Sequence, residues 1–530
     1  MKNPTYFRTS ISEHTGLILL LILCVLFTSL AQFASFALIQ NYVVGAFGAQ
    51  SEDVSLAFQM TYVGILVGLP LQFRFQRYFN TKIYLVTALV CGIIVNMGSL
   101  LTTDIDIFTL LRFIQGLITA VIAGNILIIL FSILPKEKSM IVGSSVFFGF
   151  ILICGVIIGV AGAWVTLRTD WKALYYFLIA LQVFSIIICY LLFKSKSIHS
   201  PYPLYQLDLI GIILFSGFAY ALTYTMIYGP KLDWLESKSI QKSILFGTLA
   251  FILLVYRQLN LKRPYLNLQV FRHKKFIIGI ILLSIFYGTK DSINLIYNYA
   301  GGILGWHTSD IISLGFYNVL GVLLGTGFAA FGIIKNKSNV PKLILAGFCV
   351  LLIYHVLIFN LMIPSLAFND LIIPIMLQGF ASGLLFVPIV IFSLSTLPDF
   401  TGYTGIIICA YVRFAATLNG ISGYYTLQLY YNQLYKSSFL GHITGVDYEL
   451  AQRTAAYSNF LQSKGYYGQE NTALVNTLIS KSIGLQSQLL TNKAVFFGIA
   501  LLLAIVITLL LIYIIANKIN SNKPQLSIVP

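Results

Sequence analysis

Fourteen apolar segments of roughly 20 residues run through almost the whole chain, and they constrain its fold more than any other feature. A helix of about 20 apolar residues crosses the hydrocarbon core of a bilayer and satisfies its own backbone hydrogen bonds there. Charged residues make up 9% of the sequence, against about 25% in a typical soluble protein. We therefore expect an all-α membrane protein with spans near 17–39, 54–74, 83–102, 107–132, 141–165, 173–193, 209–229, 241–257, 276–303, 311–334, 342–363, 370–396, 403–429 and 494–516.

The 33 lysines and arginines are divided unevenly between the two sides that fourteen spans define. Twenty of them fall on the side of the two termini, whereas the short loops of the opposite side carry five. Because cytoplasmic loops are enriched in Lys and Arg, we expect a multi-pass protein of the cell (inner) membrane with both termini in the cytoplasm. The net charge of +16 then follows mostly from topology and does not indicate a nucleic-acid partner.

Segments that lie eight spans apart resemble each other without a gap. An even offset preserves orientation, so the two halves are predicted to be parallel repeats around a central cavity, an arrangement typical of transporters. The matches are Gln115-Gly116 with Gln378-Gly379 and Leu134-Pro135 with Leu397-Pro398 at an offset of 263 positions, and Gly64 and Gly68 with Gly321 and Gly325 at an offset of 257.

The repeat and the spans together predict the domain organisation. The expected parts are a cytoplasmic N-terminus (1–16), an N-terminal six-helix bundle (17–200), two inserted helices (207–260), a C-terminal six-helix bundle (276–516) with an extracytoplasmic loop (430–492) between helices 13 and 14, and a cytoplasmic tail (517–530). Within the loop, "YELAQRTAAYSNFLQ" is predicted to be helical. The loop is expected to cap the bundle or to dock an external partner, for which a periplasmic adaptor protein is the candidate; the sequence slightly favours the cap.

Four charged residues lie well inside the apolar segments: Arg112, Lys290, Asp291 and Arg413. Charges at that depth cost at least ~3 kcal/mol each even on lenient insertion scales, so they mark functional sites by default. Asp291 is the one acid of the four. A carboxyl group on which burial and neighbouring cations act in opposite directions can titrate near working pH and carry a proton. A static ion pair that fixes helix packing is the alternative.

Polar residues near Asp291 recur at helical spacing. Asp291, Asn294 and Asn298 share one side of the ninth segment, and Lys290, Asn294 and Tyr297 share an adjoining side. These two sides are therefore predicted to face a substrate cavity.

The embedded charges also favour a class of substrate. Adjacent residues on a helix are ~100° apart, so Lys290 need not pair with Asp291, and one candidate arrangement pairs Asp291 with Arg413 or Arg112 across the cavity. Three cations against one acid leave the cavity at about +2, which opposes lipophilic cations. We therefore expect a small-molecule amphiphile that is neutral or anionic.

Several motifs extend this picture: "LLRFIQG" (110–116), "LPKEKSMIVG" (134–143), "LDLIGIILFSGFAYALTYTMIYGPKLDW" (207–234), "RPYLNLQVFRHKKF" (263–276) and "YVRFAATLNGISGY" (411–424). Together they resemble the major facilitator superfamily, and within it the fourteen-span drug:proton antiporter branch, over nearly the whole chain. The resemblance implies two six-helix bundles with two inserted helices, export driven by the proton gradient, and a role in proton coupling for Arg112.

The chain departs from that family at two notable places. Gln32 stands about where the family has an acid in its first span, and only Gly155 and Gly159 remain of the fifth-span antiporter motif. Gln32 and Gln115 are further candidates for the substrate cavity, although a hydrogen bond between helices explains Gln115 equally well.

The favoured function is secondary active export of an amphiphile while a proton enters, with Asp291 as the proton carrier and Arg112 and Arg413 tuning it. We expect no enzymatic activity, no metal and no cofactor, since the proton gradient supplies the energy. One alternative is an uptake transporter or facilitator for a small organic solute, with Lys290 and Asp291 as a substrate clamp. Another is an integral-membrane enzyme acting on lipid-linked substrates, for which the outer residues His442, Asp447 and Glu449 form a near-cluster without recognisable spacing.

Overall fold

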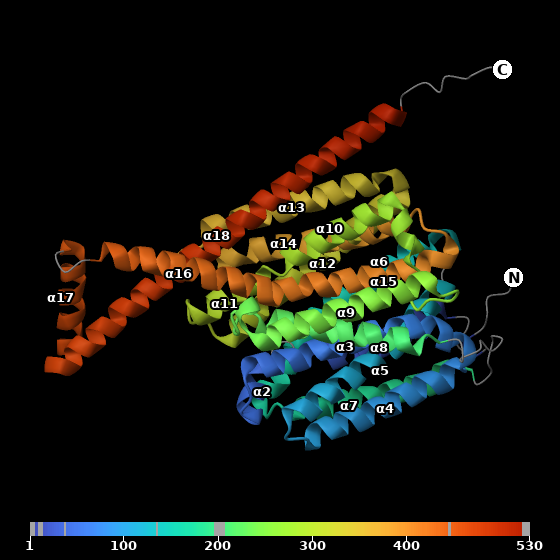
Figure 1. Cartoon of the computed structure of the whole chain (residues 1–530), viewed down its shortest axis with the longest axis horizontal. Coiled ribbons are helices and arrows are strands. Elements are labelled where there is room, and N and C mark those ends of the chain that lie inside the picture. Colours follow the sequence, from blue (N-terminus) through green and yellow to red (C-terminus); the bar gives the residue numbers. More distant parts are fainter. Residues whose placement is uncertain are drawn as a thin grey trace.

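The computed structural model describes residues 6–8, 14–36, 39–133, 136–194, 207–443 and 447–521. Every regular element of these residues is a helix, and fourteen helical stretches are long and apolar enough to cross a membrane. The predicted fold class is therefore confirmed. Figure 1 shows most of these helices side by side along the long axis of the molecule. Leu134-Pro135 and most of the predicted terminal segments lie outside the described residues.

The first half contains six spans and one short connecting helix. Their apolar side chains meet in two buried clusters, in which Ile22, Leu89 and Leu178 are fully excluded from solvent. The helices are α1 (Thr15–Ala34), α2 (Gln40–Phe47), α3 (Ser51–Tyr78), α4 (Thr81–Leu101), α5 (Ile105–Ile133), α6 (Lys136–Arg168) and α7 (Ala173–Leu192).

Two inserted helices, α8 (Leu209–Tyr228) and α9 (Lys238–Asn260), follow the first half. The Tyr228 hydroxyl donates to the carboxylate of Asp53 at the start of α3, which fixes one end of α8. At the other end Asp208 accepts from the Gly211 N–H at 2.9 Å and from Arg257 Nε at 2.7 Å, so one carboxylate joins the start of α8 to the end of α9. A single 3-10 turn, η2 (Trp234–Glu236), connects the two helices.

The second half begins after a further 3-10 turn, η3 (Leu268–Arg272). Its buried cluster joins residues of all its spans, among them Phe286, Phe348 and Phe496. The helices are α10 (Lys274–Lys290), α11 (Ile293–Gly302), α12 (Thr308–Lys335), α13 (Val340–Leu361), α14 (Phe368–Leu394), α15 (Asp399–Leu418), the π-turn η5 (Asn419–Gly423), α16 (Tyr424–His442), α17 (Tyr448–Ser463) and α18 (Gly468–Ser521), with the 3-10 turn η4 (Lys337–Asn339) between α12 and α13.

The sequence repeat corresponds to the same helix contact in each half. A Cβ built on Gly116 in α5 would lie 2.0 Å from Thr61 O in α3, and one built on Gly379 in α14 would lie 2.1 Å from Asn318 O in α12. Only glycine allows two helix backbones to approach this closely, which is how small residues drive helix packing in membranes. The second and fourth spans of both halves thus cross at equivalent glycines, as the repeat predicts.

The described residues of segment 430–492, predicted to be a loop between two spans that contains one helical stretch, are mostly helical. α16 continues to His442, and α18 begins at Gly468 and runs for 54 residues through the last span. α17 covers the stretch that was predicted to be helical and packs on α18. Figure 1 shows that α16 and α18 carry α17 far out from one end of the bundle. The segment therefore projects from the bundle, and the expectation of a cap is wrong.

Candidate functional site

A cavity of about 180 Å³ lies between the two halves. Residues of α1, α3, α5 and α6 form one wall, and residues of α14 and α15 form the other. The walls are mostly aliphatic and aromatic, with Phe33, Tyr62, Phe148 and Phe386 among them. Of the described residues that line the cavity, Arg413 is the one that carries a charge. The space suits an apolar ligand body with one polar or anionic group.

Arg413 projects from α15 into this apolar environment without an ion pair among the described residues. Its guanidinium lies 5.0 Å from the ring centre of Tyr287 and 5.8 Å from that of Tyr62. Its Nε is buried and has no hydrogen-bond partner in the described structure. Cation–π contacts stabilise a desolvated guanidinium without using up its hydrogen-bond donors, so Arg413 keeps donors for a ligand.

The ninth span breaks at the charged pair. α10 ends at Lys290, and α11 begins at Ile293. Lys290 Nζ lies 3.0 Å from Asp291 Oδ1, with the two side chains 20% and 15% exposed. Helical spacing left open whether Lys290 pairs with Asp291 or faces another helix, and the structure shows the pair. Asp291 is the residue that follows the end of α10, so the two side chains can turn toward each other.

Side chains from other helices hold this break in place. Gln378 Nε2 of α14 donates to the free Lys290 carbonyl at 2.9 Å, and Gln378 Oε1 accepts from Asn318 Nδ2 at 2.6 Å. Ser292 Oγ lies 3.0 Å from His355 Nε2, while His355 Nδ1 lies 2.7 Å from the Leu351 carbonyl. His355 is fully buried and structural, as expected for a lone histidine in an apolar span.

A second helix irregularity faces the first. The π-turn η5 interrupts the long helix that runs from α15 into α16, and π-turns inside helices occur often at functional sites. A Cβ built on Gly420 in this turn would lie 2.9 Å from Asp291 Cβ. The ring of Tyr287 links this break to Arg413, which stands two helical turns before Gly420: its centre lies 5.7 Å from Lys290 Nζ and 5.0 Å from the Arg413 guanidinium. The structure therefore brings Asp291 and Arg413 into one site, although no ion pair within 4 Å joins them among the described residues.

Arg112 lies elsewhere, in a buried polar network of the first half. Arg112 Nη1 donates to Gln32 O at 2.9 Å and to Gln115 Oε1 at 2.6 Å. Gln115 Nε2 donates to Gln32 Oε1 at 2.8 Å and to Asn96 Oδ1 at 2.6 Å, and Asn96 Nδ2 donates to Gln182 Oε1 at 2.9 Å. All five side chains are at most 1% exposed. No hydrogen bond or ion pair joins Arg112 to Asp291 in the described residues, so the pairing of these two residues is not observed.

The remaining predicted cavity residues do not line the central cavity. Asn294 and Asn298 are exposed on α11, and Tyr297 is half-buried against the core of the second half. Gln32 and Gln115 belong to the buried network and have no exposed surface. Lys290 pairs with Asp291 as described above.

Several residues of these sites escaped the sequence analysis. Asn96 and Gln182 are single polar residues in apolar spans, a pattern that marks helix-packing or functional positions. The paired glycines in "NGIS" and "GYY" signal the irregular turn that contains Gly420. Nothing in the sequence identifies Tyr62 and Tyr287 as residues of the site, because aromatic residues are as common in lipid-facing positions as in cavities.

The outer near-cluster comes together in the structure. His442, Asp447 and Glu449 line a pocket of about 320 Å³ near the tip of the helical extension, together with Arg453. Each of these side chains belongs to α16 or α17 or directly precedes α17. The wall of the pocket combines these charged side chains with apolar ones such as Ile443 and Ile479. The ends of α16 and α17 that form it project away from the bundle (Figure 1).

The proteins that resemble this chain in sequence include several named as resistance or export proteins. The sequence profile described as "Major Facilitator Superfamily" matches residues 21–423. The probable multidrug resistance protein EmrY of Escherichia coli is 23% identical over 371 residues, which cover 67% of this chain and 69% of the relative. The fatty acid resistance protein FarB of Neisseria gonorrhoeae is 22% identical over 484 residues, 88% and 89% of the two chains. The multidrug export protein EmrB of Haemophilus influenzae is 22% identical over 339 residues, 60% of each chain.

A solved structure shows the same fold. The proton:xylose symporter XylE superposes with a TM-score of 0.51 at 14% sequence identity, and the match covers 81% of this chain and 90% of that one. At such low identity the likeness supports the arrangement of helices and nothing finer.

Proposed function

The chain belongs to the major facilitator superfamily, and we propose that it is a proton-coupled exporter of amphiphilic small molecules. It is a multi-pass membrane transporter, whose relatives carry names of multidrug resistance and export proteins. The proposal places it in the inner membrane with both termini in the cytoplasm, because of the distribution of basic residues.

One observation supports this proposal above the others: the acid at membrane depth and the charge of the central cavity lie in one site. Asp291 lies at a helix break and packs against a π-turn, and its partner Lys290 and the cavity-lining Arg413 both approach the ring of Tyr287. A change of charge on Asp291 therefore alters both the ion pair with Lys290 and the environment of the ligand-facing cation. This is the connection that coupling between a proton and a substrate requires.

The proposed substrate is a neutral or anionic amphiphile. Aromatic and aliphatic walls accept an apolar body, and Arg413 offers guanidinium donors to one acidic or polar group. A lipophilic cation would meet the charge of Arg413 without an acid on the cavity wall to offset it.

The proposed proton carrier is Asp291. In the proposed scheme the contact at 3.0 Å between Lys290 Nζ and Asp291 Oδ1 belongs to the state in which Asp291 carries a negative charge. Protonation removes the attraction to Lys290, and the break between α10 and α11 can then rearrange while Gln378 still holds the Lys290 carbonyl. Arg112 does not contact Asp291 in this scheme. It donates to the backbone carbonyl of Gln32 in the first span, just as Gln378 donates to the backbone carbonyl of Lys290 in the ninth span.

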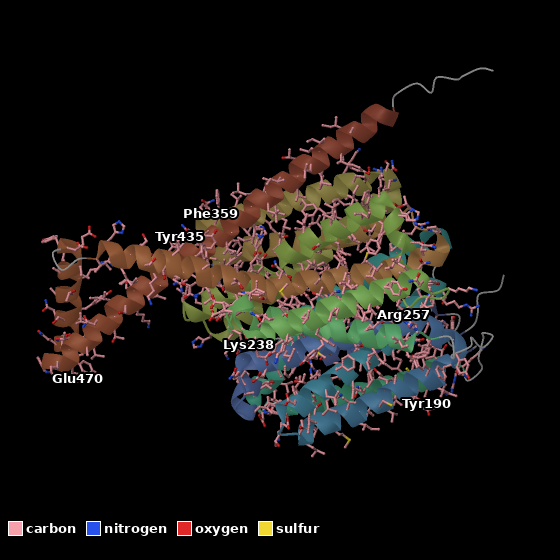
Figure 2. All side chains as sticks on the ribbon, in the orientation of Figure 1. Tyr190, Lys238, Arg257, Phe359, Tyr435 and Glu470 are labelled. Carbon is pink, nitrogen blue, oxygen red and sulfur yellow. The ribbon has the colours of Figure 1, made fainter. Side chains whose placement is uncertain are left out.

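The helical extension is the proposed site of an adaptor protein outside the membrane. Tyr448, Phe460 and Tyr467 are 79%, 57% and 68% exposed there, and aromatic side chains are enriched at protein interfaces. The pocket formed by α16, α17 and α18 adds charges of both signs through Asp447, Glu449 and Arg453. Tyr435 and Glu470, labelled in Figure 2, mark where this extension leaves the bundle and where it ends.

Transport in everted membrane vesicles tests the proposal. With an imposed pH gradient, vesicles that contain the protein should accumulate an anionic or neutral amphiphile, and collapse of the gradient should stop accumulation. A preference for quaternary ammonium dyes would contradict the substrate class, and transport independent of the gradient would indicate a facilitator.

A further inference from the structure

A second pocket, of about 430 Å³, separates the inserted helices from the second half. Its walls come from α8, α9, α15 and the segment 261–273 between α9 and α10. Phe251 and Phe271 at its border are 47% and 41% exposed, so the pocket opens toward the outside of the bundle. Its volume lies within the range of ~300–1,000 Å³ that is usual for small-molecule sites.

The walls of this pocket accept apolar groups. Its two hydrogen-bonding side chains, Gln258 and Tyr411, are already bonded within the protein. Gln258 Nε2 donates to Asp208 Oδ2 at 2.9 Å and its Oε1 accepts from the Leu266 N–H at 2.9 Å, while the Tyr411 hydroxyl donates to Leu66 O at 3.1 Å. The rest of the wall is aliphatic or aromatic, so a bound molecule has to be apolar at this depth.

A basic segment borders one end of the pocket. Residues 261–275 supply Leu266, Leu268 and Phe271 to the wall and contain no acidic residue. All the lysines and arginines of this segment are exposed, and none forms an ion pair with another described residue: Lys262, Arg263, Arg272, Lys274 and Lys275. Figure 2 labels Arg257 at the end of α9 that leads into this segment, and Lys238 at the opposite end.

We propose that this pocket binds an anionic phospholipid of the bilayer, with one acyl chain between the inserted helices and α15 and the phosphate on the basic segment. Clusters of about 4–8 Lys or Arg next to a membrane helix bind anionic headgroups, and here such a cluster adjoins an apolar pocket that opens sideways. The lipid joins the inserted helices to α15, the helix that carries Arg413. This inference rests on the pocket and the basic segment and is independent of the direction or coupling of transport.

Lipid binding to the full-length, delipidated protein in detergent tests this site by native mass spectrometry and thermal unfolding. Phosphatidylglycerol should bind and raise the unfolding temperature, whereas phosphatidylcholine with the same acyl chains should do neither. Dodecyl phosphate serves as a single-chain anion without the glycerol and second acyl chain of a phospholipid. It should bind more weakly than phosphatidylglycerol. The triple variant Arg272→Gln, Lys274→Gln and Lys275→Gln should bind phosphatidylglycerol on the order of 100-fold more weakly, because each basic residue near an anionic lipid contributes about a factor of five.

Two further variants separate the acyl chain from the headgroup. Ala415→Trp places a large side chain in the pocket from the exposed face of α15 and should abolish the stabilisation although every basic residue remains. The triple variant Lys335→Gln, Lys337→Gln and Lys342→Gln removes the same charge from another loop on the same predicted side and should bind as the wild type does. Equal binding of both phospholipids, equal loss in both triple variants, or unchanged binding by Ala415→Trp would overturn the proposal.

Discussion

The ammonium group of Lys290 lies 3.0 Å from the carboxylate of Asp291 at the point where α10 ends. Adjacent residues of a continuous helix point in different directions, so the break is what allows this pair to form. Both side chains keep some exposed surface, 20% and 15%. An ion pair that is not fully buried opens more easily than a buried one, which a proton-exchanging group needs.

Arg413 is predicted to select the charge of the substrate. Arg413→Gln should weaken binding of an anionic amphiphile by about 10- to 100-fold, the range expected for a charge-assisted hydrogen bond, and should leave a neutral analogue nearly unchanged. Arg413→Lys should restore part of the loss. Equilibrium binding of the two ligands to purified variants provides the measurement, and an equal loss for both ligands would assign Arg413 a structural role.

Gly420 is predicted to be essential for the contact between the π-turn and the helix break. Gly420→Ala places a Cβ 2.9 Å from Asp291 Cβ and should lower the free energy of unfolding by about 1–3 kcal/mol or shift one element away from the other. Gly441→Ala, on the continuation of the same long helix, has no atom within 4 Å and serves as the control. The unfolding temperature and the transport rate should both fall for Gly420→Ala and stay unchanged for Gly441→Ala. Wild-type values for Gly420→Ala would show that the contact is dispensable.

The fold was largely predictable from the sequence, because its strongest signals are local. Each span is a mostly apolar segment long enough to cross a bilayer, and the glycines that the repeat pairs, Gly116 and Gly379, make the same contact in both halves. The extension 430–492 was the exception. Its polar composition indicates exposure to solvent but does not reveal how long its helices are. Intrinsic helix propensity acts without burial, and α18 extends through this polar stretch into the last span.

The site was predictable in part. A charge in an apolar span is visible in the sequence, and this identified Asp291 and Arg413 as candidates. The break at Lys290 was not visible, since it depends on Gln378, which is distant in the sequence and satisfies the free carbonyl. The rotation of each helix, which decides whether Arg112 meets Asp291 or the amide network, likewise depends on packing across many helices.

The buried amide network should contribute to stability. Gln115→Leu removes the group that bonds Arg112, Gln32 and Asn96, and each buried polar group left without a partner costs about 1–3 kcal/mol. We expect a clear fall in the unfolding temperature measured in detergent. The exposed position Gln469 provides the control, and Gln469→Leu should have no effect within ~0.5 kcal/mol. An unchanged unfolding temperature for Gln115→Leu would show that the network is not stabilising.

Asp208 should make stability depend on pH at the acid end. Burial raises the pKa of this carboxyl, but Arg257, the Gly211 N–H and Gln258 together hold it below its usual value. Its stabilising effect is therefore complete above the unfolded pKa of about 3.9 and is lost as the pH falls through the lower, folded pKa. Asp208→Asn should cost on the order of 1–3 kcal/mol at pH 7.

Unfolding of wild type and Asp208→Asn, followed in detergent between pH 7 and pH 3, measures this dependence. The difference between the two proteins should shrink toward the acid end. A constant difference across this range would show that the charge of Asp208 is not what stabilises the ends of α8 and α9 that it joins.

The proton-carrying role of Asp291 is tested most directly by transport into everted vesicles under an imposed pH gradient, with wild type compared with Asp291→Asn. We predict that Asp291→Asn loses gradient-driven accumulation but binds an anionic amphiphile at least as tightly, because the substitution removes a negative charge and leaves Arg413 on the cavity wall. Lys335→Gln, a charge change outside the site, should transport normally. Gradient-driven accumulation that survives in Asp291→Asn would contradict the assignment and move the proton to another group.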